Sequence, residues 1–398
     1  MQIAAFGYAP YRLFWVGQLA SNIGSWMQLV ATGWLVLQLT DSPAALGLNA
    51  AFQAVPILLC SVIGGVFADR FDRYRLMLGA QLAQLVPDLT LASLVLTGRV
   101  QVWHIYLYSL TNATIRGLST PARQAFVPSL VPRAALLSAI ALNSILWQGA
   151  AVVGPTVAGV VLAAWGLPAN FLLNVASDLV NVAALLRIPV RDAKRPAIGS
   201  PWRRLAEGLA YAGREPPVRL LLFAVAVTSL LGRSYTQLMP VFARDVLDVG
   251  PRGLGLLLTM PAVGTILVAL ALAVTPLQHK GRWLLATMAL LSVALAGFAL
   301  SRLFLVSLAE LVLVGASATA ATTLTNTLLQ EHVSDPLRGR VMGFYMAATQ
   351  GAAPLGALPS GVLAEVLGAP LAVALGAGLL FACTLVLAAR TPTLRALD

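Results

Sequence analysis

Five ionisable residues interrupt long apolar stretches of the sequence: Asp88, Arg116, Asp178, Arg233 and Glu310. A charge is costly in apolar surroundings, so a charged residue retained there is commonly functional. A carboxylate that faces a cavity can exchange protons at neutral pH, and a nearby arginine favours its ionised form. We predict that Asp178 or Asp88 carries a proton and that Arg116 modulates it, with structural ion pairs as the alternative.

Uncharged polar residues in the same apolar stretches form a second candidate set. They are Asn22, Gln28, Gln53, Asn112, Asn143, Gln148, Asn174, Gln237, Asn326 and Gln350. Together with Arg233 and Glu310, we interpret them as the lining of a cavity for a small molecule. Interhelical hydrogen bonds explain most of them equally well.

Motifs of the common enzyme classes are absent from the sequence. No Gly-x-x-x-x-Gly-Lys-Ser/Thr phosphate loop, nucleophile elbow or His-Glu-x-x-His helix occurs, which excludes ATP hydrolysis by this chain. Cys60 and Cys383 fall inside apolar runs, where neither a disulfide framework nor a metal site is indicated. We expect no enzymatic activity, no metal and no cofactor.

The composition indicates a membrane protein. Of 398 residues, 59% are hydrophobic and 10% are charged, and the mean hydropathy is +0.83. Soluble domains carry about 25% charged residues, so this chain has too few charges to solvate a globule. The net charge of +11 does not indicate nucleic acid, because the basic residues lie at intervals between apolar runs rather than in one patch.

Apolar segments long enough to cross a bilayer as helices, which takes about 20 residues each, number twelve. They cover residues 12–39, 43–68, 74–97, 102–127, 137–165, 168–187, 218–243, 252–275, 282–301, 303–330, 340–365 and 369–389. The first run is too long for the apolar part of a signal peptide, so we expect it to be a spanning helix. The predicted fold class is all-α, with twelve transmembrane helices.

The longest polar stretch separates two groups of six segments. We predict an N-terminal six-helix bundle, a cytoplasmic linker and a C-terminal six-helix bundle at residues 1–187, 188–217 and 218–398. Within the linker, Trp202, Leu205 and Leu209 recur at helical spacing, which predicts a short amphipathic helix on the membrane surface. An unstructured linker is the alternative.

Basic residues concentrate in alternate loops between the segments. With the N-terminus in the cytoplasm, the outer side holds only Arg99, Arg244, Arg252 and Arg302 among the loop arginines and lysines. Cytoplasmic loops of membrane proteins carry this excess of positive charge. We therefore expect a multi-pass protein of the cell inner (cytoplasmic) membrane with both termini in the cytoplasm.

Glycines repeat between the two halves at a constant offset. Those at 149, 154, 159 and 166 recur at 351, 356, 361 and 368. The fifth segment of the first half therefore corresponds to the eleventh segment, which is the fifth of the second half. Two parallel repeats of six helices, with a substrate site near the bilayer midplane between them, are an architecture of secondary transporters. The sequence therefore predicts two pseudo-symmetric six-helix bundles.

A basic motif, GVFADRFDRYR, begins at Gly65 and follows the second segment. It resembles the major facilitator signature between helices 2 and 3, although Asp72 stands where the signature usually has glycine. The resemblance implies a conformational latch made by Gly65, Asp69, Arg70 and Arg73. Gly65 would allow close helix approach, and Asp69 would cap a neighbouring helix N-terminus, with segment 340–365 as the candidate. A basic loop that only sets topology is the alternative.

The fifth segment contains Gly149, Gly154, Pro155 and Gly159. This spacing resembles the motif associated with antiporters of the superfamily, although Gly159 is followed by valine rather than a second glycine. Small residues would let helices 5 and 8 approach, and Pro155 would bend the helix. The motif favours export, and packing alone is the alternative.

Further motifs, spread over nearly the whole chain, resemble the enterobactin-exporter-like branch, or transmembrane secretion effectors. They lie at 14–18, 121–128, 141–144, 153–155, 240–245 and 337–343. The resemblance implies proton-driven efflux of a siderophore, a macrolide or a similar amphiphile by a protein that functions as a monomer. An importer or facilitator of a nutrient, or a membrane sensor that does not transport, are the alternatives.

Overall fold

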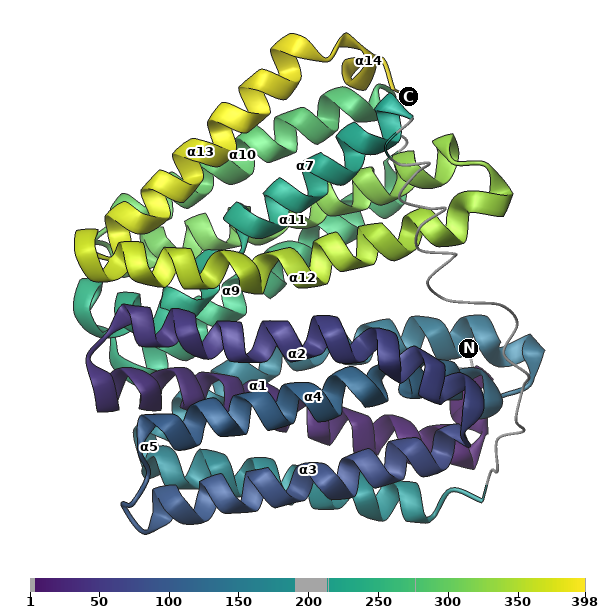
Figure 1. Cartoon of the computed structure of the whole chain (residues 1–398), viewed down its shortest axis with the longest axis vertical. Helices are drawn as coiled ribbons and strands as arrows, with labels where there is room; N and C mark the ends of the chain where they lie inside the picture. Colours follow the sequence, from purple (N-terminus) through teal and green to yellow (C-terminus); the bar gives the residue numbers. More distant parts are fainter. Residues whose placement is uncertain (1–3, 190–212, 214, 276, 398) are drawn as a thin grey trace. The chain divides into compact units, whose positions relative to one another are not determined.

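The structure is a computed structural model of the chain and describes residues 4–189, 213, 215–275 and 277–397. These residues form helices and contain no strand (Figure 1). The long helices are α1 (Ala9–Thr40), α2 (Pro43–Arg70), α3 (Arg73–Leu96), α4 (Val102–Phe126), α5 (Leu136–Leu186), α7 (Pro216–Gly232), α9 (Gly250–Val274), α10 (Lys280–Leu300), α11 (Phe304–His332), α12 (Asp335–Leu367) and α13 (Ala369–Arg390). The short elements are η1 (Ala4–Gly7), η2 (Val127–Ser129), η3 (Arg133–Ala135), η4 (Ser234–Leu238), α8 (Met239–Val241), η5 (Phe242–Val246) and α14 (Pro392–Arg395).

The element α5 consists of two successive helices. Gly166 interrupts it with φ 76° and ψ −178°, and Pro168 begins the second part. Gly368, 202 residues later in the repeat, lies between α12 and α13 with φ 84°. Glycine tolerates positive φ because it has no Cβ. With α5 divided at Gly166, the described residues contain the twelve long helices that the sequence predicts.

The seventh helix is shorter than predicted, and this corrects the continuous segment 218–243. α7 ends at Gly232, and Arg233 leaves helical geometry with φ −123° and ψ −11°. The 3₁₀ helix η4, the short α8 and the π-helical turn η5 follow. Pro240 has no N–H to donate to the carbonyl of Thr236, and its ring crowds that carbonyl, which disfavours a continuous α-helix here.

Eight helical stretches of the described residues are long and apolar enough to cross a membrane. One of them, Arg133–Leu186, contains both parts of α5. α1, α4 and α12 are not among them. In α1 and α4, polar residues recur along one face of the helix, and these residues lower the mean hydropathy of both helices.

The described residues group into two compact units. The first takes those within Met1–Asp41, Phe52–Ile198 and Gly250–Thr259, and the second those within Ser42–Ala51, Gly199–Val249 and Met260–Asp398. α2 therefore begins in the second unit and continues into the first, whereas α9 begins in the first and continues into the second. The boundary predicted within 188–217, including its amphipathic helix, lies almost entirely outside the described residues, so the domain limits stay a prediction.

Within the first unit, aromatic side chains fasten α1 to α5. The hydroxyl of Tyr11 donates to the carbonyl oxygen of Ala139 at 2.8 Å, and the indole of Trp15 donates to that of Leu142 at 3.0 Å. Tyr11 belongs to a fully buried apolar cluster that also includes Phe14 and Phe126. A buried aromatic ring with a satisfied polar atom combines apolar burial with a fixed orientation.

Two glycines in the first unit let α5 and the beginning of α9 pack backbone to backbone. A Cβ added to Gly159 would lie 2.6 Å from the carbonyl oxygen of Pro251, and one added to Gly255 would lie 2.5 Å from that of Pro155. A hydrogen bond of 2.8 Å between the hydroxyls of Thr156 and Thr259 adds to this crossing. Such close approach of helices requires small residues at the crossing point.

The second unit contains the equivalent crossing between α12 and the beginning of α2. A Cβ added to Gly361 would lie 2.7 Å from the carbonyl oxygen of Pro43, and one added to Gly47 would lie 2.8 Å from that of Ala357. Gly361 is the repeat counterpart of Gly159 in the sequence. The glycine repeat is therefore a repeat of packing geometry as well as of sequence.

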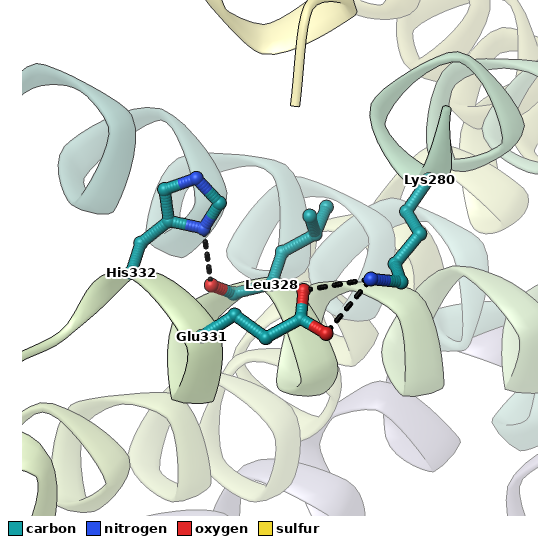
Figure 2. Close-up of polar contacts among 4 residues, drawn as sticks. All are labelled: Lys280, Leu328, Glu331 and His332. Carbon is teal, nitrogen blue, oxygen red and sulfur yellow. Dashed lines mark hydrogen bonds and ion pairs between the residues drawn. The ribbon is translucent and has the colours of Figure 1, made fainter. Parts of the chain in front are cut away.

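An ion pair joins α10 and α11 in the second unit (Figure 2). The ammonium of Lys280, the first residue of α10, contacts both carboxylate oxygens of Glu331 at 2.7 and 2.9 Å. On the same last turn of α11, Nδ1 of His332 lies 2.9 Å from the carbonyl oxygen of Leu328. The ion pair links the first turn of α10 to the last turn of α11.

Candidate functional site

Polar residues form stripes along three helices of the first unit. On α4 the stripe is Tyr108, Asn112, Arg116, Ser119 and Arg123. On α1 it is Gln18, Ser21, Ser25, Gln28 and Thr32, and on α3 it is Gln81, Gln84 and Asp88. Residues three or four apart share one face of a helix, so each stripe points in one direction.

The stripes line one cavity of about 260 Å³ in the first unit. α2 adds Gln53 to its wall, and the second part of α5 adds Asn174 and Asp178. A space between packed helices in which polar groups converge is the preferred location of a small-molecule site. This cavity is therefore the main candidate site.

Asp88 is buried in the wall of the cavity and accepts two hydrogen bonds. The hydroxyl of Tyr108 donates to Oδ1 at 2.8 Å, and Nε2 of Gln84 donates to Oδ2 at 3.0 Å. The Tyr108 hydroxyl in turn accepts from Nδ2 of Asn112 at 2.6 Å. α3 and α4 thus hold this carboxyl group in a fixed orientation.

Asp178 is buried on the second part of α5 and is held from two other helices. Ser21 of α1 and Gln81 of α3 both donate to its Oδ1, at 2.9 and 2.8 Å. Oε1 of Gln81 accepts from Asn181 at 2.9 Å. The network leaves Oδ2 of Asp178 without a hydrogen bond from these donors.

Asp88 and Asp178 line the same cavity, and their carboxyl groups are close enough to influence each other electrostatically. Two neighbouring carboxylates repel each other, and a proton on one of them removes the repulsion. Arg116 is near enough to act electrostatically on Asp178. The arrangement can therefore hold a proton and respond to a nearby cation.

Arg123 supplies a second positive charge at the cavity wall. Its Nη1 donates to Oε1 of Gln18 at 3.3 Å, and its guanidinium carbon lies 4.9 Å from the ring centroid of Trp147. Stacking on an aromatic face stabilises an arginine whose hydration is reduced. Arg123 is thus anchored between α1 and α5.

Three side chains of the cavity wall contain buried polar atoms without a hydrogen bond to any described residue. These atoms are both amide atoms of Gln28, Oγ1 of Thr32 and Oε1 of Gln84. Gln28 is only 6% exposed. A buried amide that makes no hydrogen bond costs about 1–3 kcal/mol, and a hydrogen bond to a ligand in the cavity would remove this cost.

The cavity contains part of the predicted lining. Asn22, Gln28, Gln53, Asn112 and Asn174 line it together with Asp88, Arg116 and Asp178. Arg233, Gln237 and Gln350 line a separate cavity in the second unit. Asn143, Gln148, Glu310 and Asn326 line neither of the two cavities.

Glu310 packs against α10, where Gly297 leaves space for its carboxylate. Gln148 is exposed on α5, and Asn326 accepts a hydrogen bond from Gln330 on the same helix.

Gln81, Tyr108 and Arg123 are site residues that we did not single out from the sequence. Each belongs to one of the polar stripes, with Gln81 seven residues before Asp88 and Tyr108 four before Asn112. Their helical spacing relative to the predicted acids and amides is the sequence feature that indicates they share the same helix face.

The predicted latch is only partly described. The side chain of Asp69 lies outside the described side chains, whereas Nη1 of Arg73 donates to the carbonyl oxygen of Ala125 at 3.3 Å. Asp72 caps α3 by accepting from the backbone N–H of Arg75 at 2.8 Å, which gives the residue at the usual glycine position a structural role.

The glycines next to the latch and in the antiporter-like motif differ in packing. A Cβ on Gly65 or Gly149 would have no atom within 4 Å, so neither glycine provides the close helix approach expected of it. Gly64 provides it instead, since its Cβ would lie 2.6 Å from the carbonyl oxygen of Leu118 on α4. Gly154 packs against Trp26 of α1.

Comparison with known proteins gives one family. The model of the transmembrane secretion effector family matches residues 2–398. The staphyloferrin A transporter of Staphylococcus aureus is 26% identical over 90% of both chains. The macrolide efflux protein A of Streptococcus pyogenes is 23% identical over 90% of both chains. The multidrug efflux pump Tap of Mycobacterium tuberculosis is 26% identical over 98% of this chain and 95% of its own.

Among solved structures, the nucleoside transporter NupG superposes with a TM-score of 0.75. Its sequence is 13% identical over 96% of this chain and 99% of its own. At this identity the likeness concerns the fold, and it confirms the predicted architecture of twelve transmembrane helices.

Proposed function

Because the chain belongs to the transmembrane secretion effector family of major facilitator transporters, we propose that it exports an amphiphilic small molecule in exchange for protons. A siderophore, a macrolide or another drug is the proposed cargo. The observation that carries the proposal is that two buried carboxyl groups, those of Asp88 and Asp178, line the same polar cavity.

Support for an amphiphilic cargo comes from the relatives and from the cavity. The names of three relatives specify staphyloferrin A, macrolides and multiple drugs. The cavity wall combines amides and hydroxyls with the apolar side chains of Leu29, Ile57, Met77 and Ile115. A wall of this kind contacts both the polar and the apolar parts of one molecule.

In the proposed cycle, a proton binds to the Asp88–Asp178 pair when the cavity opens to the outside and leaves when it opens to the cytoplasm. Arg116 favours release, because a positive charge near Asp178 stabilises the ionised carboxylate. Cargo and proton alternate in the cavity, so a downhill proton drives an uphill export step. Asp69, Arg70 and Arg73, which follow Gly65 in the chain, form the conformational latch of this cycle.

We further propose that the protein lies in the cytoplasmic membrane with both termini in the cytoplasm and acts as a monomer. The arginine distribution supports the orientation. The parts proposed at 1–187, 188–217 and 218–398 are the two repeats and their linker.

The proposal is tested in inverted membrane vesicles that contain the protein and are energised to a proton gradient, with erythromycin as the first cargo and a panel of siderophores and dyes next. Export predicts cargo uptake that collapses when an uncoupler dissipates the gradient. Asp88→Asn and Asp178→Asn should each reduce this uptake at least tenfold at equal protein level. Asp248→Asn, the same change at an exposed residue outside both cavities, should leave uptake unchanged.

Normal proton-driven uptake in both Asp88→Asn and Asp178→Asn would exclude this pair as the proton carrier. Accumulation of the cargo by intact cells rather than by inverted vesicles would show import instead of export.

A further inference from the structure

A second cavity, of about 180 Å³, lies in the second unit at the break in the seventh helix. The helix is interrupted at Arg233, which lies between the end of α7 and the start of η4. Backbone that leaves helical geometry within a membrane protein occurs where it is covered by protein or lines a cavity. Broken helices of transporters commonly place binding groups at such points.

Two elements supply the wall of this cavity. η4 and the residue before it contribute Arg233, Thr236 and Gln237, and α12 contributes Thr349, Gln350 and Ala353. No carboxylate is among these lining residues, which are all within the described part of the chain. The positive charge of Arg233 is therefore not neutralised by the wall itself.

Three side chains of the wall are available for a ligand. The guanidinium of Arg233 and the amides of Gln237 and Gln350 make no hydrogen bond or ion pair with the described residues. The guanidinium offers a planar set of N–H donors that matches the two oxygens of a carboxylate. Each amide adds two N–H donors, so the wall is rich in donors.

We propose that this cavity binds the carboxylate of an anionic cargo, with Arg233 as the charge partner and Gln237 and Gln350 as additional donors. The inference rests on the proposed export function and adds a preference to it: among the proposed cargoes, an amphiphile that carries at least one carboxylate occupies this cavity. A charge-assisted, two-pronged hydrogen bond is about twice as strong as a neutral one, so an uncharged analogue of the same size binds less well.

Binding is measured on the purified full-length protein in dodecyl maltoside, with benzoate as the probe and benzamide as its uncharged match. The readout is the midpoint of thermal unfolding as a function of probe concentration, because a ligand of the folded state raises the midpoint. We expect benzoate to raise it in a saturable way at millimolar concentration and benzamide to have little effect. Arg233→Gln should weaken apparent benzoate affinity by about tenfold or more.

Two further variants keep this test decisive if Arg233→Gln unfolds. Arg233→Lys keeps the positive charge but loses the planar pair of guanidinium donors, so it should bind benzoate more weakly than the unaltered protein. Gln350→Leu should weaken benzoate binding severalfold. Arg302→Gln removes an exposed arginine outside the cavity and should bind benzoate as the unaltered protein does. Equal effects of benzoate and benzamide, no effect of benzoate, or undiminished binding by Arg233→Gln would each overturn the inference.

The binding test and the transport test fail independently. Proton-driven export of erythromycin without benzoate binding would reject only the carboxylate site. Benzoate binding that depends on Arg233, together with normal export by Asp88→Asn and Asp178→Asn, would reject only the proposed proton carrier.

Discussion

The hydroxyl of Tyr108 donates a 2.8 Å hydrogen bond to Oδ1 of Asp88 across the interface between α4 and α3. The phenol oxygen also accepts a hydrogen bond from Nδ2 of Asn112. The phenol therefore links an amide of α4 to a buried carboxyl group of α3, and its loss would leave both groups with one partner fewer.

Tyr108→Phe should lower the free energy of unfolding by about 1 kcal/mol, the size of a polar contact between membrane helices. The thermal midpoint in detergent measures this loss. If Asp88 carries the proton, the pH dependence of export should also change, which a merely structural role of Tyr108 would not cause. Tyr8→Phe, at an exposed tyrosine, is the matched control and should change neither quantity.

The two glycines at 159 and 149 should respond differently to the same substitution. Gly159→Ala places a methyl group 2.6 Å from the Pro251 carbonyl oxygen and 3.0 Å from the Gly255 Cα, and these backbone atoms yield little. We expect a destabilisation of about 1–3 kcal/mol, as for other overpacked positions. Gly149→Ala meets no atom within 4 Å and should be neutral or slightly stabilising, because alanine favours helix.

The repeat offers a check of this prediction. Gly361→Ala should be as damaging as Gly159→Ala, since its methyl group would lie 2.7 Å from the Pro43 carbonyl oxygen. Equal thermal midpoints for the Gly159, Gly361 and Gly149 variants would contradict the packing described for both units.

Gln28→Leu should separate binding from stability. The Gln28 amide is buried without a partner among the described residues, and an apolar side chain of similar shape removes the cost of burying it. We expect unchanged or higher thermal stability together with a loss of erythromycin transport, seen mainly as a higher KM. A marked fall in stability with unchanged transport would assign Gln28 a purely structural role.

The predicted orientation can be checked with single cysteines introduced after Cys60 and Cys383 are replaced by serine. Lys280→Cys should react with a membrane-impermeant maleimide only after the cells are opened, because this end of α10 is predicted to be cytoplasmic. Arg302→Cys, in the short connection between α10 and α11, should react in intact cells. The opposite labelling pattern would reverse the topology. Loss of the Lys280–Glu331 pair should not disturb this assay, since exposed ion pairs contribute less than about 1 kcal/mol.

The sequence determined the fold class, the helix count and the repeat. Apolar segments of sufficient length predict helices, because in lipid the backbone N–H and C=O groups must form hydrogen bonds within the segment. Gly159 and Gly361, like Gly166 and Gly368, are separated by 202 residues. At the first pair a Cβ is excluded by close packing, and at the second pair φ is positive. Both are local requirements that glycine meets, so the sequence alone reveals them.

Only the tertiary structure decided which of the polar residues meet. Asp88 and Asp178 are 90 positions apart in the sequence, and they line one cavity only because of how α3 and the second part of α5 pack. Gln28 and Gln148 are alike as residues in apolar runs, yet one lines the cavity and the other is exposed, because a helix face is assigned by its neighbours. The break at Arg233 likewise required the structure, since a proline seven residues later in an apolar run is also compatible with a continuous, bent helix.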